Sequence, residues 1–327
     1  MAALADSPTW VKWPKLAFQP LLLGRICASI VFLLAAGVSH ALDIQFKPVA
    51  PNVYAYIGET EGRTYDNEAL NANFGLVVTP QGALLVDSGA SWQGAKKLAE
   101  AAKKVTSQPI RWVINTGGQD HRWMGNGYFL SQGATVYAHA NARSDMQARG
   151  PEHLRANAPV LKEKLEGTSV SLPNQWVSAA DTELNLGGTQ VVLVHRQGGH
   201  TPGDTMVWLP NSGVVFSGDV VYVDRILGMH AVSRSKTWLD SFAAIEQLQP
   251  KVVVPGHGQV SNLAKAQKDT GDLLKSMRQH MGRAVEEGTD LSSAVKTFDA
   301  KPFGHLQHVD VWLPQLLNRT YLEMELE

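Results

Sequence analysis

Histidines and aspartates stand beside glycines in four short segments of the sequence. The segments are residues 115–122 (NTGGQDHR), 199–204 (GHTPGD), 217–219 (SGD) and 255–258 (PGHG). The pattern places each segment at the end of a predicted strand, where glycine lets the backbone turn sharply and present a side chain to a cleft. Imidazole and carboxylate groups without thiolates suit Zn²⁺ or another divalent metal that activates a water. The segments therefore predict a metal centre that is built from several strand ends.

Taken one at a time, these residues also have structural explanations. His257 is consistent with a hydrogen-bonded histidine at a strand end, and Asp219 with a carboxylate that caps a turn. Four such segments in one chain favour a shared site instead. His195, within a predicted strand, and His139, before a predicted helix, are interpreted as structural. No role is assigned to His153, His280, His305 and His308.

Two similar successions of strands and helices surround the four segments. In the first half, strands are followed by helices predicted over 93–105 and 140–148, with a strand over 110–114 between them. In the second half, strands are followed by a helix over about 236–247 and a strand at 252–254. Two halves of this kind predict the α/β class, as one four-layer αββα sandwich with two sheets between helices.

Three regions are predicted along the chain. Residues 1–41 are assigned to a signal peptide, residues 42–260 to the sandwich domain, and residues 261–327 to a helical C-terminal extension. Apolar residues recur in the extension with helical spacing, which indicates core packing rather than a helix that binds a partner. The extension is therefore expected to pack on the same domain.

The first 41 residues have the order of a secretory signal. Lys12, Lys15 and Arg25 precede an uncharged apolar run at 26–38, and small residues follow it up to Ala41. The run is shorter than the roughly 20 residues that a membrane-spanning helix needs. Cleavage after Ala41 would give a periplasmic protein without stable membrane insertion. An uncleaved N-terminal anchor is the alternative.

The composition excludes several classes of function. The chain has 29 Lys and Arg against 30 Asp and Glu, so it has no broad positive surface for nucleic acid, and a small-molecule substrate is expected instead. With 44% hydrophobic residues it has enough apolar material for a sizeable core. The single cysteine, Cys27, lies within the predicted signal peptide. Any metal in the mature protein must therefore be held by His, Asp or Glu.

Four motifs in combination resemble those of the metallo-β-lactamase-fold hydrolase superfamily. They are NFGLVVTPQGALLVDSG at 73–89, GHTPGD at 199–204, SGD at 217–219 and VPGHG at 254–258. The resemblance implies an αββα sandwich, with one or two metal ions at its open edge. It also implies a metal-bound hydroxide that attacks an ester, thioester, lactone or lactam-type bond. Residues 317–327 further resemble an exported branch found alongside quinoprotein dehydrogenases and sulfur-oxidation systems.

The resemblance gives roles to individual residues. His200 matches the histidine of the family's third loop, Asp219 the aspartate that bridges two metals, and His257 the last histidine. The first loop departs from the family's His-x-His-x-Asp-His pattern, because Gly117 and Gln119 stand where its first two histidines are expected. A full two-metal centre is therefore not expected.

The altered first loop leaves two possibilities for the ligands. If the loop is one residue shorter, Asp120 and His121 join Asp219 and His257 as metal ligands, with His200 near or on the metal. If it is not, only three matched ligands remain. Either arrangement favours one ion over two, with Zn²⁺ as the first choice and Fe or Mn as alternatives.

Asp120 and Arg122 are the predicted catalytic residues. Arg122 takes the position of the loop's final histidine and either stabilises a developing oxyanion or forms a structural salt bridge. Asp87 and Asp204 are interpreted as residues that brace the loops and orient the ligands.

The favoured function is hydrolysis by an exported, metal-dependent enzyme. The alternative is a family member that lost hydrolysis with the histidines replaced by Gly117 and Gln119. Such a protein would bind a ligand, or a redox partner, in a periplasmic oxidation pathway. Persulfide oxygenation by a single iron fits less well, because in this fold that chemistry uses the first-loop histidines.

Overall fold

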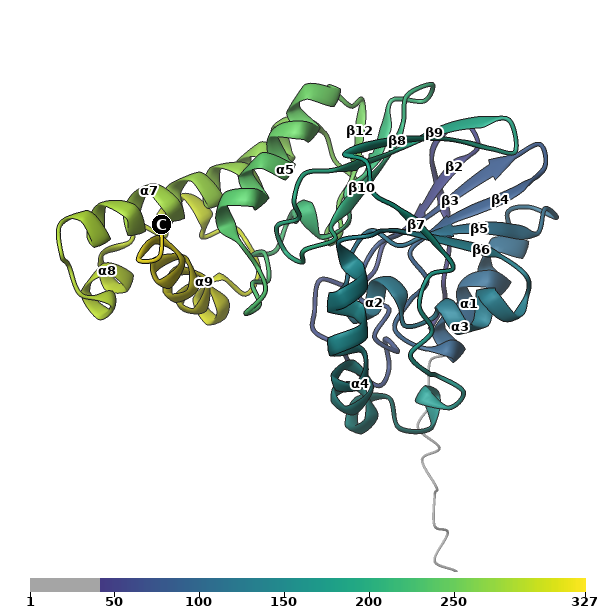
Figure 1. The fold of residues 1–327 in the computed structure, drawn as a ribbon, viewed down its shortest axis with the longest axis horizontal. Coiled ribbons are helices and arrows are strands. Elements are labelled where there is room, and N and C mark those ends of the chain that lie inside the picture. The colour runs from purple at the N-terminus through teal and green to yellow at the C-terminus, as the bar shows by residue number, and fades with distance from the viewer. Residues whose placement is uncertain (1–41) are drawn as a thin grey trace, which may run out of the picture. The chain divides into compact units, whose positions relative to one another are not determined.

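The computed structural model describes residues 42–327. The predicted signal peptide lies outside the described residues. The described chain forms two mixed β-sheets with helices on their outer faces, followed by further helices at the C-terminal end (Figure 1). Within residues 42–327, no helix has the length and apolar character needed to span a membrane.

The first sheet contains seven strands that follow one another in sequence order. They are β1 (Lys47–Ala50), β2 (Val53–Tyr56), β3 (Phe74–Thr79), β4 (Gly82–Val86), β5 (Ile110–Ile114), β6 (Thr135–His139) and β7 (Gln175–Val177). Pairing is antiparallel from β1 to β4 and parallel from β4 to β7. The parallel part places the ends of β4 and β5 side by side, where Asp87 and the first loop follow.

The second sheet contains five strands in the order β12-β11-β10-β9-β8. They are β8 (Asp181–Leu186), β9 (Thr189–His195), β10 (Thr205–Leu209), β11 (Val214–Phe216) and β12 (Val252–Val254). Strands β8 to β11 are antiparallel neighbours, and β12 pairs with β11 in parallel. The parallel pair brings the segments that carry Asp219 and His257 to one edge.

The helices flank the sheets and form the C-terminal part of the chain. They are α1 (Trp92–Lys103), α2 (Asp120–Trp123), α3 (Asn126–Ser131), α4 (Ala142–Leu161), α5 (Ser235–Leu248), α6 (Leu263–Ala266), α7 (Asp272–Glu286), α8 (Leu291–Thr297) and α9 (Val309–Met324). The helices expected over 93–105 and about 236–247 correspond to α1 and α5. Helix α4 continues well past residue 148, although it contains Pro151 and Pro159. Its buried Met146 and His153 show that tertiary packing outweighs the weak local propensity.

Three apolar layers hold the sandwich together. One cluster lies between the sheets and includes Val77 and Leu84 from the first sheet with Leu193 and Val207 from the second. A second cluster joins the first sheet to α1 and α3, and a third joins the second sheet to α5. The four-layer αββα sandwich expected from the sequence is therefore confirmed.

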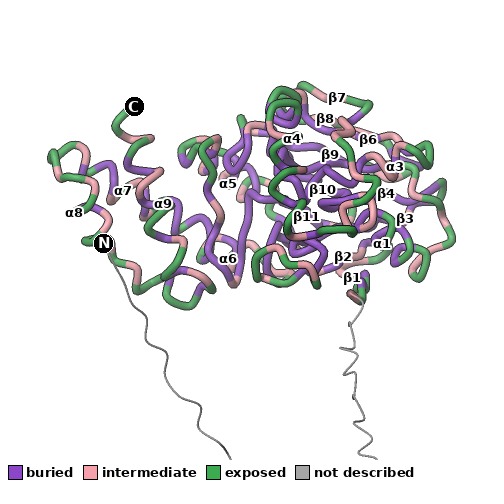
Figure 2. Tube along the Cα trace, turned by 90° about the horizontal axis from the view of Figure 1, so that it is seen from below, coloured by how far each residue is buried: buried purple, intermediate pink, exposed green. Residues whose placement is uncertain are grey.

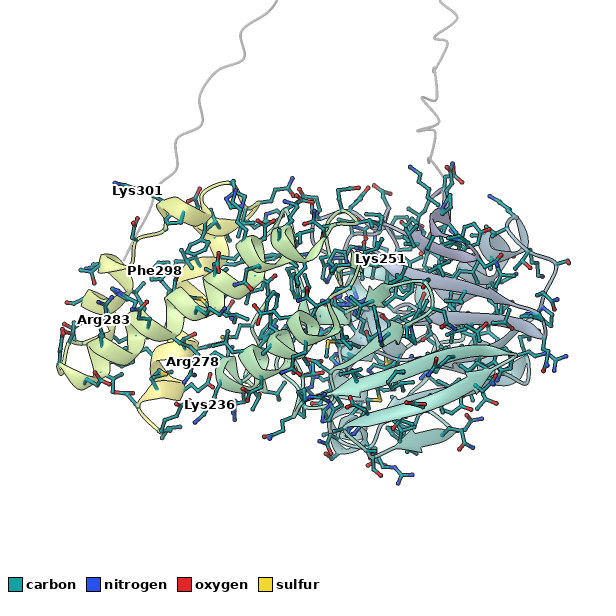
Figure 3. All side chains as sticks on the ribbon, turned by 90° about the horizontal axis from the view of Figure 1, so that it is seen from above. Lys236, Lys251, Arg278, Arg283, Phe298 and Lys301 are labelled. Carbon is teal, nitrogen blue, oxygen red and sulfur yellow. The ribbon has the colours of Figure 1, made fainter. Side chains whose placement is uncertain are left out.

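The C-terminal helices share the third cluster instead of forming a core of their own. Phe242 of α5, Leu274 of α7 and Leu317 of α9 are almost fully buried within it. Buried positions run along α5, α7 and α9 as they do through the strands (Figure 2). Arg278 of α7 pairs with Glu323 and Glu327 near the chain end, and its labelled side chain can be followed in Figure 3. Because one core is shared, the extension and the second sheet should unfold together.

Replacement of Leu274 with alanine tests this shared core. We expect Leu274→Ala to lower the free energy of unfolding by about 2–5 kcal/mol, because it leaves a cavity between α5, α7 and α9. Lys275→Ala, at the exposed next position, should change it by less than about 0.5 kcal/mol. Urea unfolding followed by circular dichroism should show one transition at a lower midpoint. Two separate transitions would contradict the shared core.

Candidate metal centre

The site forms where loops from both sheets meet. Backbone hydrogen bonds join these loops: Thr205 N donates to the Thr116 carbonyl at 2.7 Å, and Asn73 N donates to the Gly256 carbonyl at 2.9 Å. Gly258, just after His257, has a φ of +91°, and a Cβ there would lie 2.0 Å from the Val223 carbonyl oxygen. Only glycine fits this close approach, which fixes the path of the loop that carries His257.

Three buried side chains from different loops converge at this edge. His121, Asp219 and His257 each offer a ligand atom, and these atoms all lie within 4.8 Å of one another. His121 Nε2 is 3.3 Å from Asp219 Oδ2, and His257 Nε2 is 3.2 Å from Asp219 Oδ1. Two bonds of about 2.1 Å to one ion place ligand atoms at most about 4 Å apart, so both contacts fit a shared metal.

His200 adds a third imidazole beside the same carboxylate. Its Nδ1 lies 3.5 Å from Asp219 Oδ2. Its ring makes edge contacts with Trp238, at 5.6 Å between ring centroids, and with His230, at 4.9 Å. Asp219 is thus approached by imidazoles from the first loop, the β9–β10 connection and the segment after β12.

The hydrogen bonding of these histidines is incomplete without a cation. Both ring nitrogens of His121 and Nδ1 of His200 are buried and have no hydrogen-bond partner. His257 Nδ1 lies 2.9 Å from the Asn71 carbonyl oxygen and must donate to it, so its Nε2 presents a lone pair toward Asp219. A lone pair that faces a carboxylate is favourable only with a cation between them. The residues therefore fit a metal ion.

Burial keeps the imidazoles of His200 and His257 in the form that binds metal. It lowers the pKa of His257 to about 3 and holds the pKa of His200 well below its usual value. Burial alone would raise the pKa of Asp219, but the charge of Arg122 outweighs it and holds that pKa well below its usual range. Neutral imidazoles and an ionised carboxylate are the protonation states that a metal requires.

Arg122 is fully buried and donates hydrogen bonds to both carboxylate oxygens of Asp219. Its Nε donates to Asp219 Oδ2 at 3.0 Å and its Nη2 to Oδ1 at 2.7 Å, while Nη1 donates to Asp87 Oδ2 at 2.9 Å. Further donors reach the carbonyl oxygens of Asn73 and Gly256, each at 3.2 Å. All of its donors are thus directed into the protein. Two roles were expected for Arg122, a structural salt bridge and stabilisation of an oxyanion. This arrangement favours the structural salt bridge.

The structure does not bring Asp120 into the group. One of its oxygens pairs with Arg63, and the other accepts a hydrogen bond from Asn157 Nδ2 at 2.7 Å. Asp120 begins α2, and consecutive helical residues face different directions, so Asp120 and His121 do not share one face. The ligand and catalytic roles expected for Asp120 gain no support from this geometry.

The position of the family's first histidine has no room for a side chain. A Cβ on Gly117 would lie 2.7 Å from Asp204 Oδ1 and 3.2 Å from Thr201 Oγ1. Asp204 braces the loop that carries His200, because its Oδ2 accepts a hydrogen bond from Thr201 N at 2.8 Å, and burial raises its pKa to about 7. Asp87 braces the neighbouring loop by accepting from Thr116 N at 2.7 Å. Both aspartates therefore support the loops as the sequence suggested.

A cavity of about 250 Å³ opens beside the centre. His121, His200 and His257 form part of its wall. The rest of the wall includes residues that the motifs did not identify, namely Arg63, Asn71, Tyr222, Arg225, His230 and Trp312. Tyr222 and Arg225 closely follow Asp219, which is the one local indication of their location. Trp312 comes from α9, and nothing in the nearby sequence indicates its place.

These features agree with what comparison of the whole sequence shows. The family model described as the metallo-beta-lactamase superfamily matches residues 67–257, which is more than half of the chain. The chain therefore belongs to the metallo-β-lactamase superfamily.

Individual relatives are distant. A metallo-beta-lactamase type 2 from Bacillus sp. (strain 170) is 26% identical over 71% of this chain and 82% of its own length. A linear primary-alkylsulfatase from Pseudomonas sp. (strain ATCC 19151) is 22% identical over 69% of this chain and 50% of its own length. These relatives support the superfamily and not the narrower exported branch.

A solved structure of similar fold is the FIM-1 metallo-beta-lactamase from Pseudomonas aeruginosa in its mono-zinc form. It has a TM-score of 0.57 and 20% identity, and the match covers 72% of this chain and 96% of that one. A metallo-beta-lactamase from Pontibacter korlensis matches with a TM-score of 0.56 and 23% identity, over 71% of this chain and 99% of that one. These likenesses show the fold.

The buried pairing of Arg122 predicts a large cost for its removal. In metal-free protein we expect Arg122→Gln to lower the free energy of unfolding by about 3–5 kcal/mol, because Asp87 and Asp219 are left buried without a cation. Arg196→Gln, which breaks an exposed pair with Asp181, should cost no more than about 1 kcal/mol. Chemical denaturation of both variants measures the difference. Equal effects would show that the Arg122 bridge adds no more stability than a surface pair.

The crowding at Gly117 predicts that restoring a histidine does not restore a second metal. We expect Gly117→His to lower the free energy of unfolding by about 1–3 kcal/mol, because the new side chain meets Asp204 and Thr201. Metal content should not increase. Gly304→His is the control, since the atom nearest to a Cβ there is a carbonyl oxygen 3.5 Å away. A stable Gly117→His protein with an added equivalent of metal would overturn this interpretation.

Proposed function

We propose that the protein is an exported hydrolase that uses one divalent metal ion. The proposed metal is Zn²⁺, with Fe or Mn as alternatives, and the proposed substrate is a small molecule with an ester, thioester, lactone or lactam-type bond. The observation that carries the proposal is the group of three buried imidazoles around the Asp219 carboxylate, with unpartnered nitrogens, in the wall of a cavity.

Two observations support one ion rather than two. His121, Asp219 and His257 are the group of potential ligands found within residues 42–327, with His200 beside them. Arg122 places a permanent positive charge on the far side of the same carboxylate. A second divalent ion beside Asp219 would be repelled by that charge. It would also lack the histidine ligand that Gly117 replaces. The mono-zinc form reported for a structurally similar β-lactamase is consistent with a single zinc ion.

The residues of the chain hold and orient the site. Arg122 fixes the Asp219 carboxylate, and the Asn71 carbonyl fixes the ring of His257. Tyr222 stacks on His257 at 4.9 Å between ring centroids, and burial keeps its pKa well above its usual value, so its phenol remains a neutral group at the cavity. A divalent metal bound in such a site lowers the pKa of a coordinated water and polarises a carbonyl.

Export and a pathway partner are further parts of the proposal. The order of charged, apolar and small residues in 1–41 supports a periplasmic location, with an uncleaved anchor as the alternative. The second candidate function is binding without catalysis. It is favoured by Gly117 and Gln119, which stand at positions where the family has histidines. In that case the protein binds a ligand, or a redox partner in a periplasmic oxidation pathway, without turnover.

The proposal predicts one equivalent of metal that depends on His257. We expect purified protein to hold about one divalent ion, and His257→Ala to lose it together with about 100-fold or more of any ester or lactam hydrolysis, because a ligand is removed. His280→Ala is the matched control, since that ring lies in the extension and contacts the Ala294 carbonyl. Elemental analysis and assays on an ester, thioester, lactone and lactam panel provide the measurements.

The outcomes separate the two candidate functions. Protein that stays metal-free after incubation with zinc, iron or manganese salts would contradict a metal centre. Metal binding with ligand-induced thermal stabilisation, but without turnover, would favour the binding protein. Turnover that is lost in His257→Ala and kept in His280→Ala would support the hydrolase.

A further inference from the structure

Residues 222–226 carry none of the candidate metal ligands, but they pair with the segment that carries His257. Tyr222 and His257 are partners in a parallel β-bridge, and Val223 N donates to the His257 carbonyl at 3.0 Å. The ring of Tyr222 also stacks on the His257 imidazole, at 4.9 Å between ring centroids. The position of His257 therefore depends on residues 222–226, which we call the support segment.

The other edge of the support segment is bonded by side chains of the C-terminal extension. In extended chain, the backbone groups of alternate residues point to opposite edges, so those of Tyr222 and Asp224 point away from the bond at Val223. Thr270 Oγ1 accepts from Tyr222 N at 3.0 Å and donates to the Tyr222 carbonyl at 2.5 Å. Asp269 Oδ2 accepts from Asp224 N at 3.0 Å. Two consecutive side chains thus take the place of a neighbouring strand.

The backbone of Gln307 completes this outer edge. Its N donates to the Asp224 carbonyl at 2.9 Å, and its carbonyl accepts from Ile226 N at 3.0 Å. Buried backbone groups require such partners, and here the extension supplies them. Thr270, Asp269 and Gln307 all follow residues 67–257, the part of the chain that matches the family model.

The side chains that bond the support segment are themselves fixed. They lie in a π-helical turn, Gln267–Gly271, and such turns frequently occur at functional sites. Thr270 is fully buried, and Asp269 is 1% exposed. The Asp269 carboxylate also pairs with Lys265 Nζ at 2.8 Å and with His305 Nε2 at 2.9 Å. A continuous set of bonds therefore runs from the extension through the support segment to His257.

We propose that Thr270, together with Asp269, is a positioning residue of the metal centre and acts on His257 through the support segment. The inference rests on the metal binding in the proposed function and does not depend on hydrolysis. A histidine binds metal tightly when its ring is held in the bound orientation, and loss of a supporting partner typically weakens metal binding by about 10- to 100-fold. The extension thus contributes to metal affinity, although the candidate ligands all precede it.

Removal of the Thr270 hydroxyl tests the proposal. Thr270→Val keeps the shape of the side chain but leaves the backbone N–H and carbonyl of Tyr222 without this partner. We expect it to weaken Zn²⁺ binding by about 10-fold, measured by competition with a chelator. Thr270→Ser keeps the hydroxyl and should stay within about 2-fold of the parent.

Thr320→Val is the matched control. Thr320 is also fully buried in the extension, but its hydroxyl donates to the Leu316 carbonyl of its own helix at 2.9 Å. Both valine variants should lower the thermal midpoint, whereas only Thr270→Val should weaken zinc binding. Affinities are compared at a temperature well below both midpoints, so that each variant is folded.

Asp269→Asn is a second and milder variant. It keeps an acceptor for Asp224 N but removes the charge that pairs with Lys265 and His305, so we expect about 3-fold weaker zinc binding. This variant decides the question if Thr270→Val does not fold.

Amide hydrogen exchange provides a measurement that needs no metal. The amide of Val223 should exchange about 10-fold faster in Thr270→Val than in the parent, because its bond to the His257 carbonyl opens more readily when the support segment is loosened. Thr320→Val should leave this exchange unchanged.

The outcomes separate the positioning role from the proposed function. If the parent binds no metal but Val223 exchange accelerates in Thr270→Val alone, the metal centre fails and the control of His257 by the extension stands. If zinc binds and both Thr270→Val and Asp269→Asn bind it like the parent, the metal centre stands and the positioning role is overturned. An equal loss of affinity in Thr320→Val would assign the effect to the general stability of the extension and would also overturn it.

Discussion

The bridge from Asp87 through Arg122 to Asp219 is the interaction on which the arrangement of the centre depends. Asp87 follows a strand of the first sheet, Asp219 follows a strand of the second, and Arg122 lies on the short helix between them in space. Buried charges are tolerated when they are paired and hydrogen-bonded, so the guanidinium holds both loops in one geometry. Arg122 fixes the Asp219 carboxylate by hydrogen bonds, and the three imidazoles approach the same carboxylate. The same bridge that joins the two sheets thus orients the residue at the middle of the centre.

The altered first loop still supplies one histidine to the group of candidate metal ligands. His121 belongs to the group of candidate ligands, whereas Asp120 lies outside it and pairs with Arg63. Asp204 and Thr201 occupy the space that a side chain at position 117 would need. They also brace the loop that carries His200. The missing histidines are therefore part of a consistent packing arrangement. Such packing is consistent with the proposed single-metal centre.

The C-terminal extension contributes to the site as well as to the core. Helix α7 shares apolar packing with the second sheet, and α9 places Trp312 in the wall of the cavity. The matched part of the chain supplies the histidines and the aspartate, and the extension adds Trp312, Gln315 and Leu316 to the cavity wall. Both parts of the chain therefore contribute to one cavity.

The sequence by itself determined the sandwich, because strand and helix periodicity is a local property, and it identified His121, His200, Asp219 and His257 through glycine-flanked motifs. It did not decide which of Asp120 and His121 faces the centre, since that depends on where a helix begins. Arg122 binds carboxylates 35 and 97 residues away, and Trp312 reaches Arg225 from the last helix. Such pairings depend on how two sheets and an extension pack together. Tertiary structure alone decided them, because the free energy of a buried charge depends on its neighbours in space.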